Sequence, residues 1–228
     1  MDAKNKNGPL KGLIVIDLTR VLAGPYASMI LSDLGARIIK VEPPLGDDSR
    51  EFSPFVNNQS AYFASLNREK ESIKLDLKSE KDKLIFEELI KNADILLENY
   101  KPGTMEKLGY GYKSLSKKYP NLIYASCSGF GQTGPWATKP AYDMIVQGMG
   151  GLMSVTGHEG QEPVRVGTSI GDITAGLFTT IGILASLIDK NKHGNGQAID
   201  VSMLDCQIAI LENAIARYFA TGESPPPG

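Results

Sequence analysis

The sequence has 228 residues, of which 42% are hydrophobic and 22% are charged, and its 24 basic and 26 acidic side chains leave a formal charge of −2. This composition is typical of a soluble globular protein with one large domain, and it excludes disorder and coiled coil. The scattered lysines form no basic stripe for a nucleic acid, and the longest apolar run, residues 177–188, is shorter than the ~20 residues that span a bilayer.

The N-terminal residues 1–12 are polar and lack the apolar core of a secretory signal, which favours the cytoplasm. In that reducing compartment we expect Cys127 and Cys206 to be buried thiols rather than a disulfide. Two cysteines and two histidines cannot build a usual structural zinc site, so we expect no metal.

The first part of the chain alternates predicted strands with a predicted helix. Residues 13–18 and 36–42 are short, apolar and β-branched, which is typical of strands buried on both faces of a parallel sheet. Between them, Gly24-Pro25 and Leu34-Gly35 mark the start and the end of a helix. Residues 72–78 alternate polar with apolar side chains and predict a strand near a sheet edge.

The same alternation continues through the middle of the chain. Residues 45–60 have no clear period and predict a loop. Ser79 and Asp82 indicate the capped start of an amphipathic helix, which precedes a strand at 94–98. A further strand is predicted at 122–127, after another short helical segment.

The last part of the chain predicts a buried helix at 171–189, a strand at 198–201 and an amphipathic helix at 203–219. Strands that alternate with helices predict an α/β fold, a Rossmann-like, doubly wound, mostly parallel sheet with helices on both faces. Residues 1–222 form the predicted large domain. The proline run in 223–228 is typical of a linker, so we expect this chain to be part of a longer protein.

Two glycine motifs suggest functions that their surroundings oppose. Residues 129–134 match the G-x-G-x-x-G pattern of dinucleotide-binding proteins, but Pro135 follows at once and no helix opens there, which argues against nicotinamide or flavin binding. Residues 167–171 match G-x-S-x-G and make Ser169 a hydrolase candidate. The only later histidine, His193, lies beyond a helix of roughly 27 Å, so a serine hydrolase is disfavoured.

Asp172 allows two compatible interpretations. It stands at the start of the buried helix, where free amides and the helix dipole favour a carboxylate, so it is either a helix cap or a nucleophile stabilised by the same amides. Tyr142 and Asp143 either orient a substrate or pack a loop. His158 is expected in an exposed turn, and the lysines of residues 114–118 at a solvated helix end.

A series of short motifs extends over nearly the whole chain: Asp17-Leu18-Thr19-Arg20, Ala23-Gly24-Pro25, Asp33-Leu34-Gly35-Ala36, Ile39-Lys40-Val41-Glu42, Leu75-Asp76-Leu77-Lys78, Glu98-Asn99-Tyr100-Lys101-Pro102-Gly103, Ser128-Gly129-Phe130-Gly131-Gln132-Thr133-Gly134-Pro135, Ala141-Tyr142-Asp143, Gly171-Asp172 and Gly194-Asn195-Gly196-Gln197. With these motifs in this order, the sequence resembles the class III CoA-transferases. This CaiB/BaiF family includes formyl-CoA transferase, carnitine CoA-transferase and α-methylacyl-CoA racemase.

The resemblance implies that Asp172 attacks an acyl-CoA thioester and forms an aspartyl-acyl anhydride, from which CoA passes to an acceptor carboxylic acid. It implies Ala141, Tyr142 and Asp143 as a substrate loop. Coenzyme A is implied as a substrate rather than a tightly bound cofactor, and it would contact Leu22, Ala23, Leu75, Asp76, Leu77, Lys78, Asn99, Tyr100, Lys101 and Lys107.

The resemblance also carries differences. Pro43 and Pro140 replace an arginine and a lysine of formyl-CoA transferase, so nucleotide contacts are expected to rearrange, with Lys139 as one substitute. Tyr142 stands where the racemases have a catalytic histidine, and its ordinary pKa of about 10 suits proton transfer poorly, which favours CoA transfer over racemisation. A CoA-binding chain without catalysis is the other alternative. Family members continue into a smaller domain and form interlocked homodimers.

Overall fold

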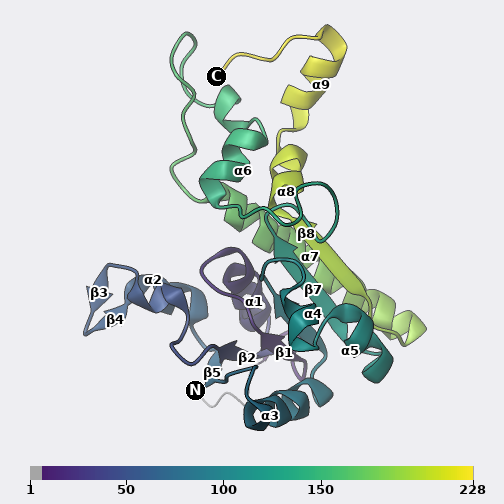
Figure 1. The fold of residues 1–228 in the computed structure, drawn as a ribbon. Helices are drawn as coiled ribbons and strands as arrows, with labels where there is room; N and C mark the ends of the chain where they lie inside the picture. The colour runs from purple at the N-terminus through teal and green to yellow at the C-terminus, as the bar shows by residue number, and fades with distance from the viewer. Residues whose placement is uncertain (1–6, 228) are drawn as a thin grey trace.

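The computed structural model describes residues 7–227, so residues 1–6 of the predicted domain and Gly228 of the predicted linker lie outside the described residues. Six parallel strands form the main sheet in the order β5-β2-β1-β6-β7-β8 (Figure 1). Chain order runs outward in both directions from the central pair β1 and β6, which confirms the doubly wound α/β fold. The strands are β1 (Ile14–Asp17), β2 (Arg37–Glu42), β5 (Glu71–Lys74), β6 (Ile95–Glu98), β7 (Ile123–Ser128) and β8 (Ala198–Ser202).

Two helices cover one face of this sheet. They are α1 (Ala23–Asp33) and the long α7 (Ile170–His193), which pack against each other. Leu31 of α1 and Ile183 of α7 share one buried cluster with the alternate strand residues Val15 and Leu97. Ala23 at the start of α1 and Ala175 near the start of α7 share a separate buried cluster, so the starts of both helices are held by one part of the core.

The opposite face packs against α3 (Glu80–Lys91), α4 (Thr104–Leu108) and α5 (Tyr112–Lys118). Phe86 of α3 is fully buried there and meets the ring of Tyr110 edge-on, with 4.8 Å between ring centroids. Lys117 and Lys118 occupy the last turn of α5, as predicted for a solvated helix end.

Three further groups of elements lie outside these layers. Figure 1 shows α6 (Asp143–Met149), α8 (Met203–Ile210) and α9 (Glu212–Thr221) together at the top of the view. The hairpin of β3 (Phe55–Val56) and β4 (Gln59–Ser60) projects to the left together with α2 (Ala61–Asn67). Within residues 7–227, the remaining elements are the short 3₁₀ helices η2 (Asp48–Glu51) and η3 (Leu152–Val155).

Three sequence predictions need correction. The predicted strand at 72–78 pairs with β2 only as far as Lys74, because β2 itself ends at Glu42 before Pro43-Pro44. The predicted helix at 203–219 is two helices that bend apart at Leu211, since α8 packs on α7 whereas α9 has left the core and buries no residue. The predicted loop at 45–60 contains η2 and the β3–β4 hairpin.

The helix α7 is long and apolar enough to cross a membrane by length and composition alone. Half of its most apolar window is buried inside the structure, against α1 and the sheet. That packing is typical of the core helix of a doubly wound protein. Cys127 and Cys206 are buried free thiols, as predicted.

Candidate active site

Asp172 lies in the first turn of α7, and its carboxyl group is half-buried. The backbone N–H of Ala23, the first residue of α1, faces this carboxyl group closely enough to lower its pKa. The two helices approach closely because position 176 is glycine: a Cβ there would lie only 2.7 Å from the carbonyl oxygen of Ala23. The sequence thus places the N-terminus of a second helix against Asp172.

The surroundings of Asp172 oppose its ionisation. Burial raises the pKa of the carboxyl group to about 7, the negative charge of Asp143 adds to that rise, and the Ala23 amide acts in the opposite direction. From α2, Tyr62 lies close enough that burial, aided by the charges of Asp172 and Asp47, raises the pKa of its phenol to about 12. Tyr62 therefore stays protonated at neutral pH.

Asp143, rather than Asp172, caps the long helix. One oxygen of the buried Asp143 carboxylate accepts from the Gly171 N–H at 2.7 Å, and the other accepts from Nε2 of Gln147 at 2.7 Å. The fully buried Gln147 also accepts from the Val166 N–H at 2.8 Å, which ties the segment before α7 to α6. Because Asp143 meets the free amide, the carboxylate of Asp172 is left available for another partner.

The other two residues of the predicted substrate loop lie beside Asp143 with different roles. Ala141 packs on Gly129, where an added Cβ would lie 2.3 Å from the Ala141 methyl group. Tyr142 is 77% exposed, so its ring is free of the core. The turn at Gly129 thereby fixes the position from which α6 starts.

The residues predicted to contact CoA gather just beyond the carboxyl ends of β1, β5 and β6, the edge at which open α/β sheets bind ligands. Leu75 and Leu77 are buried, and Lys78, Lys101 and Lys107 are exposed. Asp76 accepts from the Lys78 N–H at 2.9 Å and so shapes the turn after β5. The arrangement offers exposed cations and backbone groups to an anionic ligand.

Asn99 has a task that its motif did not reveal. Its amide accepts from the Arg20 N–H and donates to the Arg20 carbonyl, both at 2.8 Å. This pairing fastens the turn after β6 to the loop between β1 and α1. The guanidinium group of Arg20 lies 5.4 Å from the ring centroid of Tyr100. Asn99 and Tyr100 therefore hold the loop that leads to Leu22 and Ala23.

Both disfavoured motifs are placed as the sequence predicts. No helix follows the glycines of residues 129–134 until α6 begins at Asp143. Ser169 immediately precedes α7, whereas His193 is the last residue of that helix, 24 residues along. His158 is exposed, and the described residues contain no group of three or more metal-ligating side chains.

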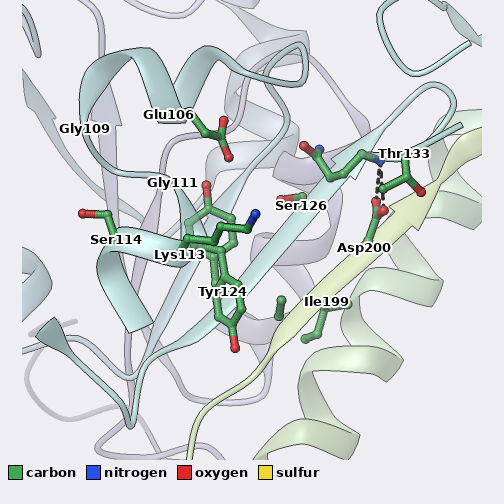
Figure 2. Close-up of a pocket in the computed structure, with 13 residues that line it drawn as sticks. Glu106, Gly109, Gly111, Lys113, Ser114, Tyr124, Ser126, Thr133, Ile199 and Asp200 are labelled. Atoms are coloured by element: carbon green, nitrogen blue, oxygen red, sulfur yellow. Dashed lines mark hydrogen bonds between the residues drawn. The ribbon is translucent and has the colours of Figure 1, made fainter. Parts of the chain in front are cut away.

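A pocket of about 670 Å³ lies elsewhere, between β7, β8 and the α4–α5 segment. Figure 2 shows Tyr124 and Ile199 at its base and Glu106 and Lys113 around it. None of the predicted site residues lines this pocket.

Residues 10–228 match the sequence profile of CoA-transferase family III. The chain belongs to this family. As a member of CoA-transferase family III it is 53% identical over 220 residues to an acetyl-CoA:oxalate CoA-transferase of Acetobacter aceti, which covers 96% of the chain and 57% of that relative. It is 45% identical to a succinyl-CoA:glutarate CoA-transferase of Mus musculus over 92% of the chain and 49% of that relative.

The solved structures agree with this assignment to CoA-transferase family III. A CaiB/BaiF family protein from Brucella suis superposes with a TM-score of 0.94 at 43% identity, over 97% of this chain and 60% of that one. The chain therefore spans about half to three fifths of the length of the relatives that it matches.

Proposed function

We propose that the protein transfers coenzyme A from an acyl-CoA thioester to a carboxylic acid, with Asp172 as the nucleophile. The observation that carries the proposal is the carboxyl group of Asp172, half-buried where the N-termini of α1 and α7 meet and faced by the Ala23 amide. A desolvated carboxylate is a better nucleophile than a solvated one, and the amides around it can stabilise the oxyanion that forms during attack. Similarity to named CoA-transferases supports the same chemistry.

The exchange needs only this carboxylate, the thioester and the acceptor acid. A carboxylate oxygen of Asp172 attacks the thioester carbonyl carbon, the C–S bond breaks, and CoA leaves as the thiolate, which gives a mixed anhydride. The thiolate then attacks the Asp172 carbonyl carbon and expels the donor acid. This leaves a thioester between Asp172 and CoA. The acceptor carboxylate attacks the carbonyl carbon of that thioester and displaces the CoA thiolate, which gives a second anhydride. The thiolate then attacks the acceptor acyl carbon of this anhydride, which forms the new acyl-CoA and frees the Asp172 carboxylate.

The partners of this reaction follow from the same site. We propose that CoA binds at the carboxyl edge of β1, β5 and β6, with Lys78, Lys101 and Lys107 toward its phosphates. We also propose that the complete protein is a cytoplasmic, interlocked homodimer without a tightly bound cofactor, and that residues 1–222 form its CoA-binding large domain.

Substitution of the nucleophile tests the proposal. In the complete protein, Asp172→Ala is expected to abolish CoA exchange, and hydroxylamine added during turnover is expected to modify Asp172 alone, because an anhydride is trapped as the hydroxamate. Transfer is followed by mass spectrometry with a panel of carboxylic acids and several CoA thioesters.

The matched control is Asp189→Ala, which removes another acidic side chain from the same helix, at its far end. It is expected to leave the exchange unchanged. Full activity of the Asp172→Ala variant would refute the proposal. Proton exchange beside the thioester without any acceptor acid would instead identify a racemase.

A further inference from the structure

The loop between β1 and α1 has a strained backbone. Val21 adopts φ 66°, in the left-handed region that a β-branched residue rarely occupies. Such a conformation persists only where the surrounding structure fixes it. Two residues later the chain reaches Ala23, whose amide meets Asp172. The conformation of Val21 therefore bears directly on where that amide points.

Buried polar groups hold this loop at each step. The Thr19 N–H donates to Asp17 at 2.8 Å, and the Thr19 carbonyl accepts from Nζ of Lys40 at 2.6 Å. The Val21 N–H lies 3.4 Å from a carboxylate oxygen of Asp47. Asp17 is the residue of β1 from which the loop starts, whereas Lys40 and Asp47 come from β2 and from the segment after β2, about 20 or more residues along the chain.

The anchors Lys40 and Asp47 form an ion pair of 2.8 Å, with side chains that are 1% and 0% exposed. Asp47 also accepts from the Ser49 N–H at 2.9 Å and the Ser49 hydroxyl at 2.7 Å, which fixes its carboxylate. A buried ion pair is weak evidence for stability, because desolvation offsets the attraction between the charges. What this pair provides is a rigid donor for the Thr19 carbonyl and a rigid acceptor for the Val21 N–H.

A second buried pair secures the other end of the loop. Lys70 lies 3.3 Å from Asp17, and both side chains are at most 1% exposed. The ammonium group of Lys70 also donates to the Pro25 carbonyl at 3.0 Å and to the Ser28 hydroxyl at 2.8 Å, in the first turns of α1. Lys70 thus secures α1 from Pro25 onward, whereas the Lys40–Asp47 pair contacts the backbone of residues 19–21, which leads directly to Ala23.

We propose that Lys40 and Asp47 are positioning residues of the candidate active site, which hold Val21 in its left-handed conformation so that the Ala23 amide stays directed at Asp172. Neither side chain is placed in contact with substrate; both act through the loop. The proposal rests on the proposed function, because it assigns a purpose to the Asp172–Ala23 contact.

The test is the neutral pair Lys40→Met with Asp47→Asn in the complete protein. It removes both charges together, so no buried charge is left unpaired, and the new amide side chain keeps an acceptor oxygen for Ser49. We expect kcat to fall about 100-fold, because a displaced amide no longer supports the reacting group, while KM for acyl-CoA changes less than about threefold. A purely structural pair would lower the melting temperature without this division between kcat and KM.

The pH profile provides a second readout. The groups that face Asp172 are Asp143 from α6, Tyr62 from α2, Cys127 from β7 and the Ala23 amide from α1. Only the amide lowers the pKa of Asp172. Loss of that contact should raise the pKa of Asp172 and move the acid limb of kcat toward higher pH.

Val21→Gly is expected to restore part of the kcat that the neutral pair loses. Glycine adopts a positive φ without steric cost, so the loop needs less help to reach its conformation. Added to the neutral pair, this substitution should recover about tenfold of the lost kcat. If the Lys40–Asp47 pair does not hold the loop, Val21→Gly would not raise the kcat of the neutral-pair variant.

The matched control is Arg37→Met with Glu71→Gln, which removes an ion pair of 2.7 Å between β2 and β5 at the other end of the same strand. It should leave kcat and the acid limb unchanged. Hydrogen exchange of residues 18–23, expected to accelerate only in the Lys40/Asp47 variant, is measured independently of catalysis. If that variant does not fold, the polar pair Lys40→Gln with Asp47→Asn takes its place with the same readouts, because it too leaves no buried charge unpaired.

The outcomes separate the two proposals. An unsubstituted protein without CoA transfer would overturn the proposed function, while faster exchange in residues 18–23 would still support the role of the pair in holding the loop. An active protein whose Lys40/Asp47 variant keeps its kcat, its acid limb and its exchange rate would overturn the positioning role alone.

Discussion

Asp143 places a second negative charge beside Asp172 while it caps the helix that carries Asp172. Its carboxylate is held by the Gly171 N–H and by Gln147, so it cannot turn away. The charge of Asp143 adds to the effect of burial in raising the pKa of Asp172 to about 7. One residue therefore sets both the location of α7 and the ionisation of the proposed nucleophile.

Asp143→Asn should separate these two effects. The asparagine oxygen can still accept from Gly171, whereas its NH2 group cannot accept from Gln147 and that bond is lost. The negative charge is gone, so the pKa of Asp172 should fall toward the ordinary aspartate value. Since the ionised form attacks, the acid limb of kcat/KM should move to lower pH. The profile of Asp189→Asn serves as the reference. An acid limb that does not move would mean that burial alone sets the pKa.

At the level of secondary-structure elements, the crossing of α1 and α7 determines how close the Ala23 amide lies to Asp172. Gly176 permits it, because a Cβ would lie 2.7 Å from the Ala23 carbonyl and 3.1 Å from the ring of Tyr26. Backbone cannot yield as a flexible side chain can, so the helices would have to separate. The distance between Ala23 and Asp172 therefore depends on a residue that touches neither carboxylate nor substrate.

Gly176→Ala is accordingly expected to destabilise the protein by about 1–3 kcal/mol, although alanine is ordinarily the better helix former. It should also lower kcat, because the Ala23 amide moves with α1. Gly148→Ala is the control: this glycine lies within α6, and a Cβ would make an ordinary contact of 3.4 Å with Met153. Denaturant unfolding and kcat are measured for both. Equal stability of the two variants would contradict the close-approach argument.

Strands and long helices were predictable because their signals are local. Val15 and Ile38 belong to apolar runs, and the strands that contain them begin and end within a residue or two of the predictions. The helices η2 and α2 were not predicted, since each depends on a single side-chain cap, Asp47 or Ser60, rather than on a repeating pattern of apolar residues. The β3–β4 hairpin between them was not predicted either. A cap of this kind is common in loops and carries little sequence signal.

The candidate site was predictable only in part, for a similar reason. Asp172 and the motif residues could be named from the sequence, but the contact of Asp143 with Gly171 spans 28 residues and has no sequence pattern. Tyr62 and Asp47 lie in segments without periodicity and reach the site only through the fold. Lys40 resembles any polar residue of a strand until Asp47 is brought against it.

Across the whole molecule, buried carboxyl groups have opposite effects on how stability depends on pH: some stabilise the fold more at high pH and others more at low pH. Hydrogen bonds from Arg50 and Ser72 outweigh burial and lower the pKa of Glu42 from 4.5 to about 2, so Glu42 stabilises the fold above pH 4.5 and loses that effect as the pH falls toward 2. The pKa of Asp17 and of Asp47 is also lowered, largely by Lys70 and Lys40 acting against burial. Acid should therefore unfold the protein through this end of the sheet.

Glu98 acts in the opposite direction. Burial raises its pKa from 4.5 to about 7, even though the side chain accepts from the Tyr100 N–H at 2.7 Å. A raised carboxyl pKa means that the folded state binds the proton more tightly than the unfolded state does. The contribution of Glu98 is thus complete below pH 4.5 and is lost as the pH rises through 7. Together with Glu42, it predicts a stability maximum near pH 5.

Glu98→Gln should reduce the loss of folding stability at alkaline pH, because the amide is neutral at every pH and its oxygen can still accept from the Tyr100 N–H. We expect the variant to exceed the parent protein in stability at pH 8 by at most about 3 kcal/mol, the equivalent of this pKa difference, and to match it at pH 4. Melting temperatures from pH 3 to pH 9 measure the effect. The exposed Glu159→Gln should reproduce the parent curve. A Glu98→Gln curve parallel to that of the parent would mean that Glu98 is ionised at no cost and that its burial is relieved by water.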